Sequence, residues 1–152
     1  MAEETAHCIA CSTTNPQSLG MRFEMQGDRC LGHYTPTEEH CGWRGVTHGG
    51  LLFTALDEVM ANWLWLQGLA GFTARSEVRY RAPVATGTAL RLEAWCLRQR
   101  KRVVDLQGQI VDERSGEVVA EAEARLMLLQ GPPTLGEQGS RQRRRGASLG
   151  EA

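Results

Sequence analysis

The chain has 152 residues, with 17 basic and 18 acidic side chains and a formal net charge of -1. This length indicates one domain, or one domain with a tail. A net charge near zero argues against a nucleic-acid-binding protein, which normally carries a basic excess. With 41% hydrophobic and 23% charged residues, the composition also excludes collagen, a coiled coil and general disorder.

The C-terminal part of the chain differs from the rest in composition. Residues 130–152 contain four Arg, two Glu, two Pro and five Gly, and few apolar side chains. So little apolar surface can be buried there that it does not offset the entropy of ordering. We therefore expect a flexible N-terminus over residues 1–6, a folded domain over residues 7–129 and a basic disordered tail over residues 130–152.

Neither a targeting signal nor a membrane span is indicated. The N-terminus is acidic and lacks the basic and apolar regions of a signal peptide. No stretch approaches the ~20 apolar residues that a membrane span needs. Five scattered cysteines do not form the disulfide framework of a secreted protein. These patterns predict a cytoplasmic protein that binds neither membrane nor nucleic acid.

Two short strands are predicted first. Residues 19–25 place an apolar side chain at every second position, as in a strand with one buried face. A second strand is predicted over residues 30–34, after a turn at Gly27 and Asp28.

A long helix is predicted from Gly49 to Gln67. Its apolar side chains occupy nearly the whole circumference, so we expect it to be buried on nearly all sides. At 1.5 Å per residue it is about 28 Å long, enough to span a small domain. Gly68 and Gly71 are expected to stop it.

Four longer strands are predicted after the helix. In order, they are residues 73–82, 89–99, 102–113 and 117–129. Alternation in the first puts Ala74, Ser76 and Tyr80 on the buried face and Thr73 on the other. The alanine-rich last segment leaves a helix as an alternative, but its strict period of two favours a strand.

This order of elements predicts an α+β fold. A single helix cannot cover both faces of a sheet of five or six strands. We therefore expect an antiparallel five- to six-stranded sheet wrapped around a long central helix, with the remaining surface packed against a second copy of the chain.

One carboxylate lies within the apolar helix. Asp57 has Phe53, Ala61 and Leu64 at helical spacing on its own face. A buried, unpaired aspartate costs several kcal/mol, so such a residue is either paired, exposed or functional. Spacing alone leaves all three interpretations open.

A glycine-rich segment leads into the helix. Residues 42–50 end in His48-Gly49-Gly50, where the unpaired N–H groups of the helix start and its dipole would meet a ligand. Glycine allows close approach to the backbone. Such donors form an oxyanion hole when they face a carbonyl oxygen that becomes negative. Thr47 is the alternative here, as an ordinary helix cap.

Together, His48-Gly49-Gly50 and Asp57 nine residues after the histidine resemble the hotdog-fold thioesterases, and specifically their PaaI-like acyl-CoA thioesterase branch. The resemblance covers residues 8–129. It includes the Cys8-x-x-Cys11 pair near the N-terminus and the Pro83-to-Gly87 turn after the predicted strand 73–82.

The resemblance implies the roles of the site residues. Gly49 would bind the thioester carbonyl oxygen through its amide, and Asp57 from the other subunit would activate water or attack the thioester carbon. His48 and Gly50 would bind the substrate. Thr73 would hold the water or the carboxylate.

The resemblance also implies an acyl-CoA substrate with a small-to-medium acyl or aryl-acyl group, a homodimer or a tetramer of two dimers, and no cofactor beyond the coenzyme A of the substrate. The alternative is a non-catalytic acyl-CoA-binding hotdog protein. Many members carry an asparagine six residues before the histidine, where this chain has Gly42. Side chains that could line the acyl pocket are Phe53, Met60, Trp63 and Trp65.

Two further features are interpreted as structural. Cys8 and Cys11 lack a second Cys-x-x-Cys pair to complete a zinc site, so we expect no metal; completion by Cys30, His33, His40 and Cys41 is the alternative. The basic segment 98–102 is interpreted as a solvated turn, with binding of coenzyme A phosphates as the alternative.

Overall fold

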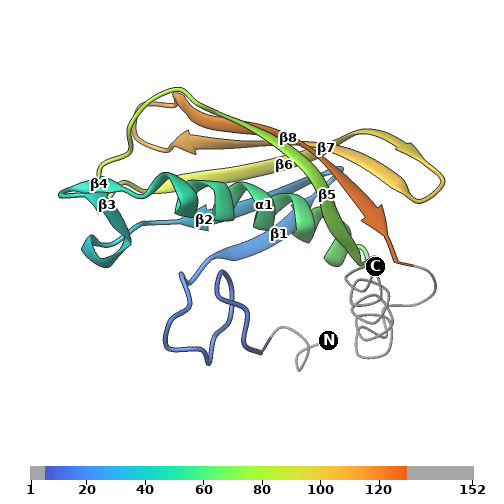
Figure 1. Ribbon diagram of the computed structural model, residues 1–152, viewed down its shortest axis with the longest axis horizontal. Coiled ribbons are helices and arrows are strands. Elements are labelled where there is room, and N and C mark those ends of the chain that lie inside the picture. Colours follow the sequence, from blue (N-terminus) through green and yellow to red (C-terminus); the bar gives the residue numbers. More distant parts are fainter. Residues whose placement is uncertain (1–5, 130–152) are drawn as a thin grey trace, which may run out of the picture.

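The computed structural model describes residues 6–129 and contains one long helix against a six-stranded antiparallel sheet (Figure 1). The main elements are β1 (Arg22–Gln26), β2 (Arg29–Tyr34), α1 (Gly49–Trp65), β5 (Gly71–Tyr80), β6 (Leu90–Arg100), β7 (Val103–Asp112) and β8 (Val118–Leu128). A 3-10 turn (Glu38–His40) and the short strands β3 (Cys41–Trp43) and β4 (Val46–Thr47) precede α1. The predicted tail, residues 130–152, lies outside the described residues.

The strands of the large sheet follow the order β1-β2-β6-β7-β8-β5, so β1 and β5 form its edges. All neighbouring pairs are antiparallel. The hairpin between β1 and β2 turns at Gly27, which has a φ of +62°. The predicted α+β class and the predicted long strands are confirmed, and the alanine-rich β8 is a strand.

The helix packs against the concave face of the sheet and supplies the centre of the core (Figure 1). Its buried apolar side chains are Leu52, Ala55, Leu56, Val59, Met60, Trp63 and Leu64. They meet apolar side chains of the strands, among them Leu92, Leu106 and Ile110. A Cβ on Gly108 of β7 would lie 3.2 Å from Met60 Cγ, so this glycine lets the helix approach the sheet closely.

The expectation that α1 is buried on nearly all sides is wrong for the single chain. Phe53 and, directly after the helix, Leu66 remain 38% and 41% exposed, because the sheet covers one side of the helix and the N-terminal segment covers only part of the other. The helix also ends two residues early, at Trp65, with Gly68 at a φ of +78° after it. Gly71 is not part of the stop, since β5 begins there.

A bulge in β5 changes which side chains face the helix. Thr73 pairs with Leu126 of β8 and Arg75 pairs with Arg125, so Ala74 is the extra residue. The predicted alternation therefore fails at this end of the strand. Thr73 faces α1 rather than the outer surface, because a bulge reverses the side-chain alternation beyond it.

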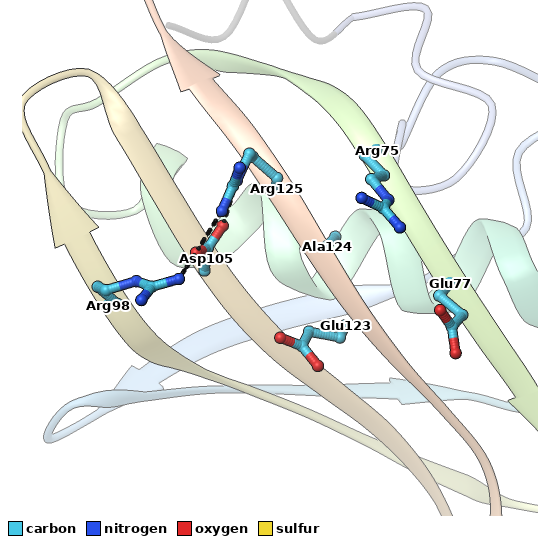
Figure 2. Close-up of a pocket in the computed structure, with 7 residues that line it drawn as sticks. All are labelled: Arg75, Glu77, Arg98, Asp105, Glu123, Ala124 and Arg125. Carbon is cyan, nitrogen blue, oxygen red and sulfur yellow. Dashed lines mark hydrogen bonds and ion pairs between the residues drawn. The ribbon is translucent and has the colours of Figure 1, made fainter.

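The outer face of the sheet carries a charged network (Figure 2). The carboxylate of Asp105 accepts hydrogen bonds from Arg125 Nε at 2.8 Å and from Arg98 Nη2 at 3.0 Å. These bonds hold the pKa of the Asp105 carboxyl below its usual range. Glu77, Glu123 and Arg75 line the same shallow cavity. Arg98, which belongs to the basic segment 98–102, therefore has a structural partner in Asp105.

Within residues 6–129, no helix has both the length and the apolar character needed to cross a membrane.

Candidate active site

The short hairpin of β3 and β4 delivers the chain to the start of α1. Its turn contains Gly45, which has a φ of +76°. The Thr47 N–H donates to Val84 O at 2.7 Å, and the His48 N–H donates to His40 O at 2.9 Å. Two backbone bonds thus fix the helix start in place.

The helix cap is His48 and not Thr47. His48 has an extended backbone, with φ -62° and ψ 129°, and its Nδ1 accepts a hydrogen bond from Gly50 N–H at 2.9 Å. Thr47 Oγ1 is buried and has no hydrogen-bond partner among the described residues. The side chain of His48 therefore takes over the capping role that serine, threonine or aspartate usually fills.

Of the N–H groups in the first turn of α1, that of Gly49 is uncommitted. Gly50 donates to His48 Nδ1, while Leu51 and Leu52 donate to His48 O at 3.0 and 3.3 Å. No acceptor within residues 6–129 takes the N–H of Gly49, which lies at the exposed end of the helix. The helix start thus presents one free donor at the positive end of its dipole.

Tyr80 of β5 holds the other side of this turn. Its hydroxyl donates to Gly49 O at 2.9 Å, and its ring lies 3.6 Å from where a Cβ on Gly49 would be. Both polar atoms of the Gly49–Gly50 peptide are therefore occupied, by Tyr80 and His48. The alternation of residues 73–82 predicts that Tyr80 is buried. Its hydrogen bond to Gly49 could not be predicted, since only the fold brings Tyr80 to the helix start.

A cavity of about 230 Å³ opens beside this turn. It is lined by Thr47, Gly49, Leu52, Tyr80, Arg81, Ala82, Pro83 and Val84. The free N–H of Gly49 therefore borders space that a ligand can enter.

Asp57 lies two turns along the same helix, on its side away from the core. Its Oδ1 accepts a hydrogen bond from Thr73 Oγ1 at 2.7 Å, and the pair is open to solvent. Among the described residues no arginine forms an ion pair with Asp57. The interpretation of Asp57 as one half of a buried ion pair is therefore wrong within residues 6–129.

The structure does not bring Gly49 and Asp57 of one chain to the same place. They are eight residues apart on a straight helix, a separation of about 12 Å at 1.5 Å per residue. A donor to a thioester oxygen and a group acting on its carbon must both lie within about 3 Å of neighbouring atoms. Gly49 and Asp57 of the same chain are therefore too far apart to act on one thioester group.

Gly42, the departure from the family pattern, packs against the helix cap. A Cβ at this position would lie 3.2 Å from His48 Cδ2 and 3.3 Å from His48 Cα. A side chain at this position would require His48 to shift by a few tenths of an ångström. The glycine is thus matched to the position that His48 occupies in this chain.

A second, larger cavity of about 360 Å³ lies on the open side of α1. Its lining includes Ala61, one helical turn beyond Asp57, and Trp65, together with the loop that leads into β5. Of the other predicted pocket side chains, Met60 and Trp63 are in the core, and Trp63 Nε1 donates to Asp28 O at 2.8 Å. Only Trp65 of the four lines this cavity.

Comparison with known proteins identifies the family. The model of the thioesterase superfamily matches residues 44–119, which include Gly49, Asp57 and Tyr80. No curated protein is similar enough in sequence to count as a match.

Solved structures share the fold at low sequence identity. The PaaI protein from the phenylacetic acid degradation operon of E. coli has a TM-score of 0.72 at 23% identity, over 86% of this chain and 95% of that one. A hypothetical thioesterase with coenzyme A from Streptococcus pneumoniae TIGR4 has a TM-score of 0.68 at 20% identity, over 74% and 90%. A Streptococcus mutans UA159 protein bound to acetyl CoA has a TM-score of 0.64 at 17% identity, over 71% and 89%.

These structures, like this chain, wrap an antiparallel sheet around one long helix, the arrangement that the sequence analysis predicted. Since the family model matches half of the chain and the solved structures share its fold, the chain belongs to the thioesterase superfamily and has the hotdog fold.

Proposed function

We propose that this protein is an acyl-CoA thioesterase, which hydrolyses a small-to-medium acyl or aryl-acyl thioester to the free acid and coenzyme A. The observation that carries the proposal is the single uncommitted N–H of Gly49 at the start of α1, which borders a cavity. The reaction takes only the thioester and water, with coenzyme A as part of the substrate.

In this mechanism the Gly49 N–H donates to the thioester carbonyl oxygen. The bond strengthens as that oxygen becomes negative, and the helix dipole adds to the field. One such donor typically contributes about 10²- to 10³-fold in kcat. His48 and Tyr80 keep the neighbouring peptide from turning, and His48 and Gly50 form the wall along which the substrate lies.

The carboxylate of Asp57 from a second chain supplies the attack. As a general base it takes a proton from water, the water oxygen bonds to the carbonyl carbon, and the C–S bond breaks. The leaving thiolate then takes up a proton. Asp57 as a nucleophile is the other route, through an anhydride that water opens. In a single turnover in ¹⁸O-water, the appearance of ¹⁸O in the Asp57 side chain identifies the nucleophile route in which water opens the anhydride at the Asp57 carbonyl.

Because Gly49 and Asp57 of one chain are too far apart, the proposed site needs a homodimer, and two such dimers can pair into a tetramer. The open side of α1 and the edge strand β5 both carry exposed apolar side chains, including Phe53 and, at 43% exposure, Phe72. A sheet edge with unpaired backbone groups beside an apolar helix side is a surface that a second copy can cover. Analytical ultracentrifugation is expected to give twice or four times the chain mass.

The acyl group is proposed to enter the cavity beside Ala61 and Trp65. Its lining there is largely apolar, and Ala61 is one turn from Asp57. The coenzyme A in the Streptococcus pneumoniae structure and the acetyl CoA in the Streptococcus mutans structure support coenzyme A thioesters as the substrate class. All five cysteines are free, which agrees with the proposed cytoplasmic location.

Thiol release from a panel of short, long and aromatic acyl-CoAs tests the proposal. The wild type is expected to hydrolyse at least one class, and Asp57→Ala to lose roughly 10²-fold or more in kcat. Equal rates for Asp57→Ala and wild type contradict the mechanism. Tight binding of acyl-CoA by the wild type without release of thiol favours the alternative, a non-catalytic binding protein.

A further inference from the structure

Three ligand-forming side chains that are far apart in the sequence meet beside α1. Cys8 and Cys11 come from the N-terminal segment, and Glu58 follows Asp57 on the helix. Cys8 Sγ donates to Glu58 Oε1 at 3.4 Å, and Cys11 Sγ donates to the same oxygen at 3.3 Å. The three ligand atoms all lie within 4.8 Å of one another.

Within residues 6–129, this is the one group of three or more His, Cys, Asp or Glu side chains close enough to share a metal ion. The other side chains that could have completed a zinc site, Cys30, His33, His40 and Cys41, do not belong to this group. His40 Nδ1 is bonded to the hydroxyl of Tyr34 at 3.0 Å, and His33 pairs with Glu113 on the outer side of the sheet. The third ligand is a helix carboxylate 47 residues beyond Cys11, which no Cys-x-x-Cys spacing reveals.

The spacing of these atoms fits tetrahedral zinc. With Zn–S of about 2.3 Å and Zn–O of about 2.1 Å, a tetrahedral angle puts sulfur and oxygen about 3.6 Å apart. The observed 3.3 and 3.4 Å are shorter by a few tenths of an ångström. The two sulfur–oxygen distances are therefore within a few tenths of an ångström of those around a tetrahedral zinc ion.

The surroundings prepare the carboxylate for this role. Asn62 is buried, and its Nδ2 donates to Glu58 Oε1 at 3.3 Å and to Glu58 O at 2.9 Å, which fixes the direction of the side chain. Burial raises the pKa of the Cys11 thiol, and the neighbouring Cys8 and Glu58 raise it further. In the metal-free protein both thiols donate hydrogen bonds to one carboxylate oxygen.

We propose that Cys8, Cys11 and Glu58 bind one Zn²⁺ ion, with water as the fourth ligand. Cys11 and Glu58 both line the cavity of about 360 Å³, from which the water reaches the ion. Binding replaces the two thiol protons, which are released to solvent. Two thiolates and a carboxylate leave the site with one negative charge, and Arg22, whose Nη1 donates to Cys11 O at 3.4 Å, lies beside it.

The ion attaches the N-terminal segment to α1. Residues 6–21 contain no helix or strand, and backbone bonds such as Leu19 N–H to Ile9 O at 2.8 Å hold their turns. A zinc ion adds a link from this segment to the residue after Asp57. The ion thus links the N-terminal segment to α1, and the test of metal binding does not depend on the proposed hydrolase activity.

The test uses the full chain, without an affinity tag and in a non-thiol, non-chelating reductant. After zinc is removed, Co²⁺ is added and the thiolate-to-cobalt charge-transfer absorption is recorded, and Zn²⁺ affinity is measured against a chromophoric chelator. We expect about one ion per chain, tetrahedral cobalt absorption, and loss of affinity by at least about tenfold in Cys8→Ser, Cys11→Ser and Glu58→Gln.

Cys41→Ser is the matched control, since Cys41 is an exposed free thiol outside the group. It is expected to keep wild-type affinity. The proposal is overturned if the wild type shows no thiolate-to-cobalt absorption, a result that needs no variant to fold. It is also overturned if Cys41→Ser loses as much affinity as Cys11→Ser, or if Glu58→Gln binds zinc as the wild type does.

Discussion

Thr73 on β5 donates a 2.7 Å hydrogen bond to Asp57 on α1, and this bond exists because of the bulge at Ala74. Without the extra residue, strict alternation would turn Thr73 to the outer face of the sheet. The bulge instead aims its hydroxyl at the helix, a common use of bulges next to functional residues. The orientation of the carboxylate is therefore set from the edge strand.

Thr73→Val removes this hydrogen bond and keeps the shape of the side chain. A bond to a charged group contributes about 1.5–3 kcal/mol, so we expect kcat for thioester hydrolysis to fall roughly 10- to 100-fold. Thr73→Ser keeps the hydroxyl and is expected to retain most of the activity. Equal losses in both variants would contradict a specific role for the hydroxyl group.

Gly49→Pro tests the free N–H directly. Proline is favoured at the first position of a helix, and His48 already has the extended backbone that a residue before proline prefers. The variant is expected to fold with a normal circular dichroism spectrum and to lose about 10²- to 10³-fold in kcat. Gly49→Ala keeps the N–H, and its Cβ would make only ordinary contact with Tyr80. A Gly49→Pro enzyme as active as Gly49→Ala would eliminate this donor from the mechanism.

Tyr80→Phe leaves the ring on Gly49 but removes the bond to its carbonyl oxygen. We expect a fall of several-fold in kcat with a smaller change in KM, because the peptide beside the donor gains freedom while the cavity keeps its shape. Steady-state kinetics measure both constants. A change confined to KM would indicate that the hydroxyl binds substrate rather than positioning the turn.

Asp105 is expected to make stability depend on acid pH. Its pKa is lowered in the folded state, so its contribution is present above the ordinary value of 3.8 and is lost as the pH falls through the folded value. The Tm of the wild type should therefore drop below about pH 4. Asp105→Asn should have a lower Tm at neutral pH and a shallower acid decline. Parallel curves for the two proteins would rule out this contribution.

Two glycines in the sheet should respond differently to alanine. A Cβ on Gly71 would lie 2.8 Å from the backbone oxygen of Met127, which cannot move without disturbing β8. A Cβ on Gly108 would press only on the flexible side chain of Met60, at 3.2 Å, and would make ordinary contact with Leu56 at 3.5 Å. Chemical denaturation should show that Gly71→Ala loses about 1–3 kcal/mol of unfolding free energy and that Gly108→Ala loses less. The reverse order would contradict this account.

The sequence predicted the long elements well because each carries its own periodicity, whereas the short strands β3 and β4 were not predicted. The long helix and the four long strands appear within two residues of the expected limits. The bulge at Ala74 was missed, since alternation continues through it in the sequence. Tyr80 was missed for a related reason: a tyrosine in an alternating strand reads as a core residue until the fold brings it to Gly49.

The partners of single side chains were the least predictable part. His48 as the cap, Asp57 with Thr73, and Glu58 with the two cysteines all depend on contacts between distant segments. Residue type and local spacing indicate which groups are available for chemistry. Only the packing of α1 against β5 and the N-terminal segment decides which of them meet.

The eight-residue separation between Gly49 and Asp57 has a genetic consequence. Chains carrying Gly49→Pro and chains carrying Asp57→Ala are each expected to be inactive as homodimers. When they are refolded together, each mixed dimer holds one site with both defects and one site with none. With random pairing half of the dimers are mixed, and each has one intact site of two. About a quarter of the wild-type activity should therefore return, so that two inactive variants complement each other.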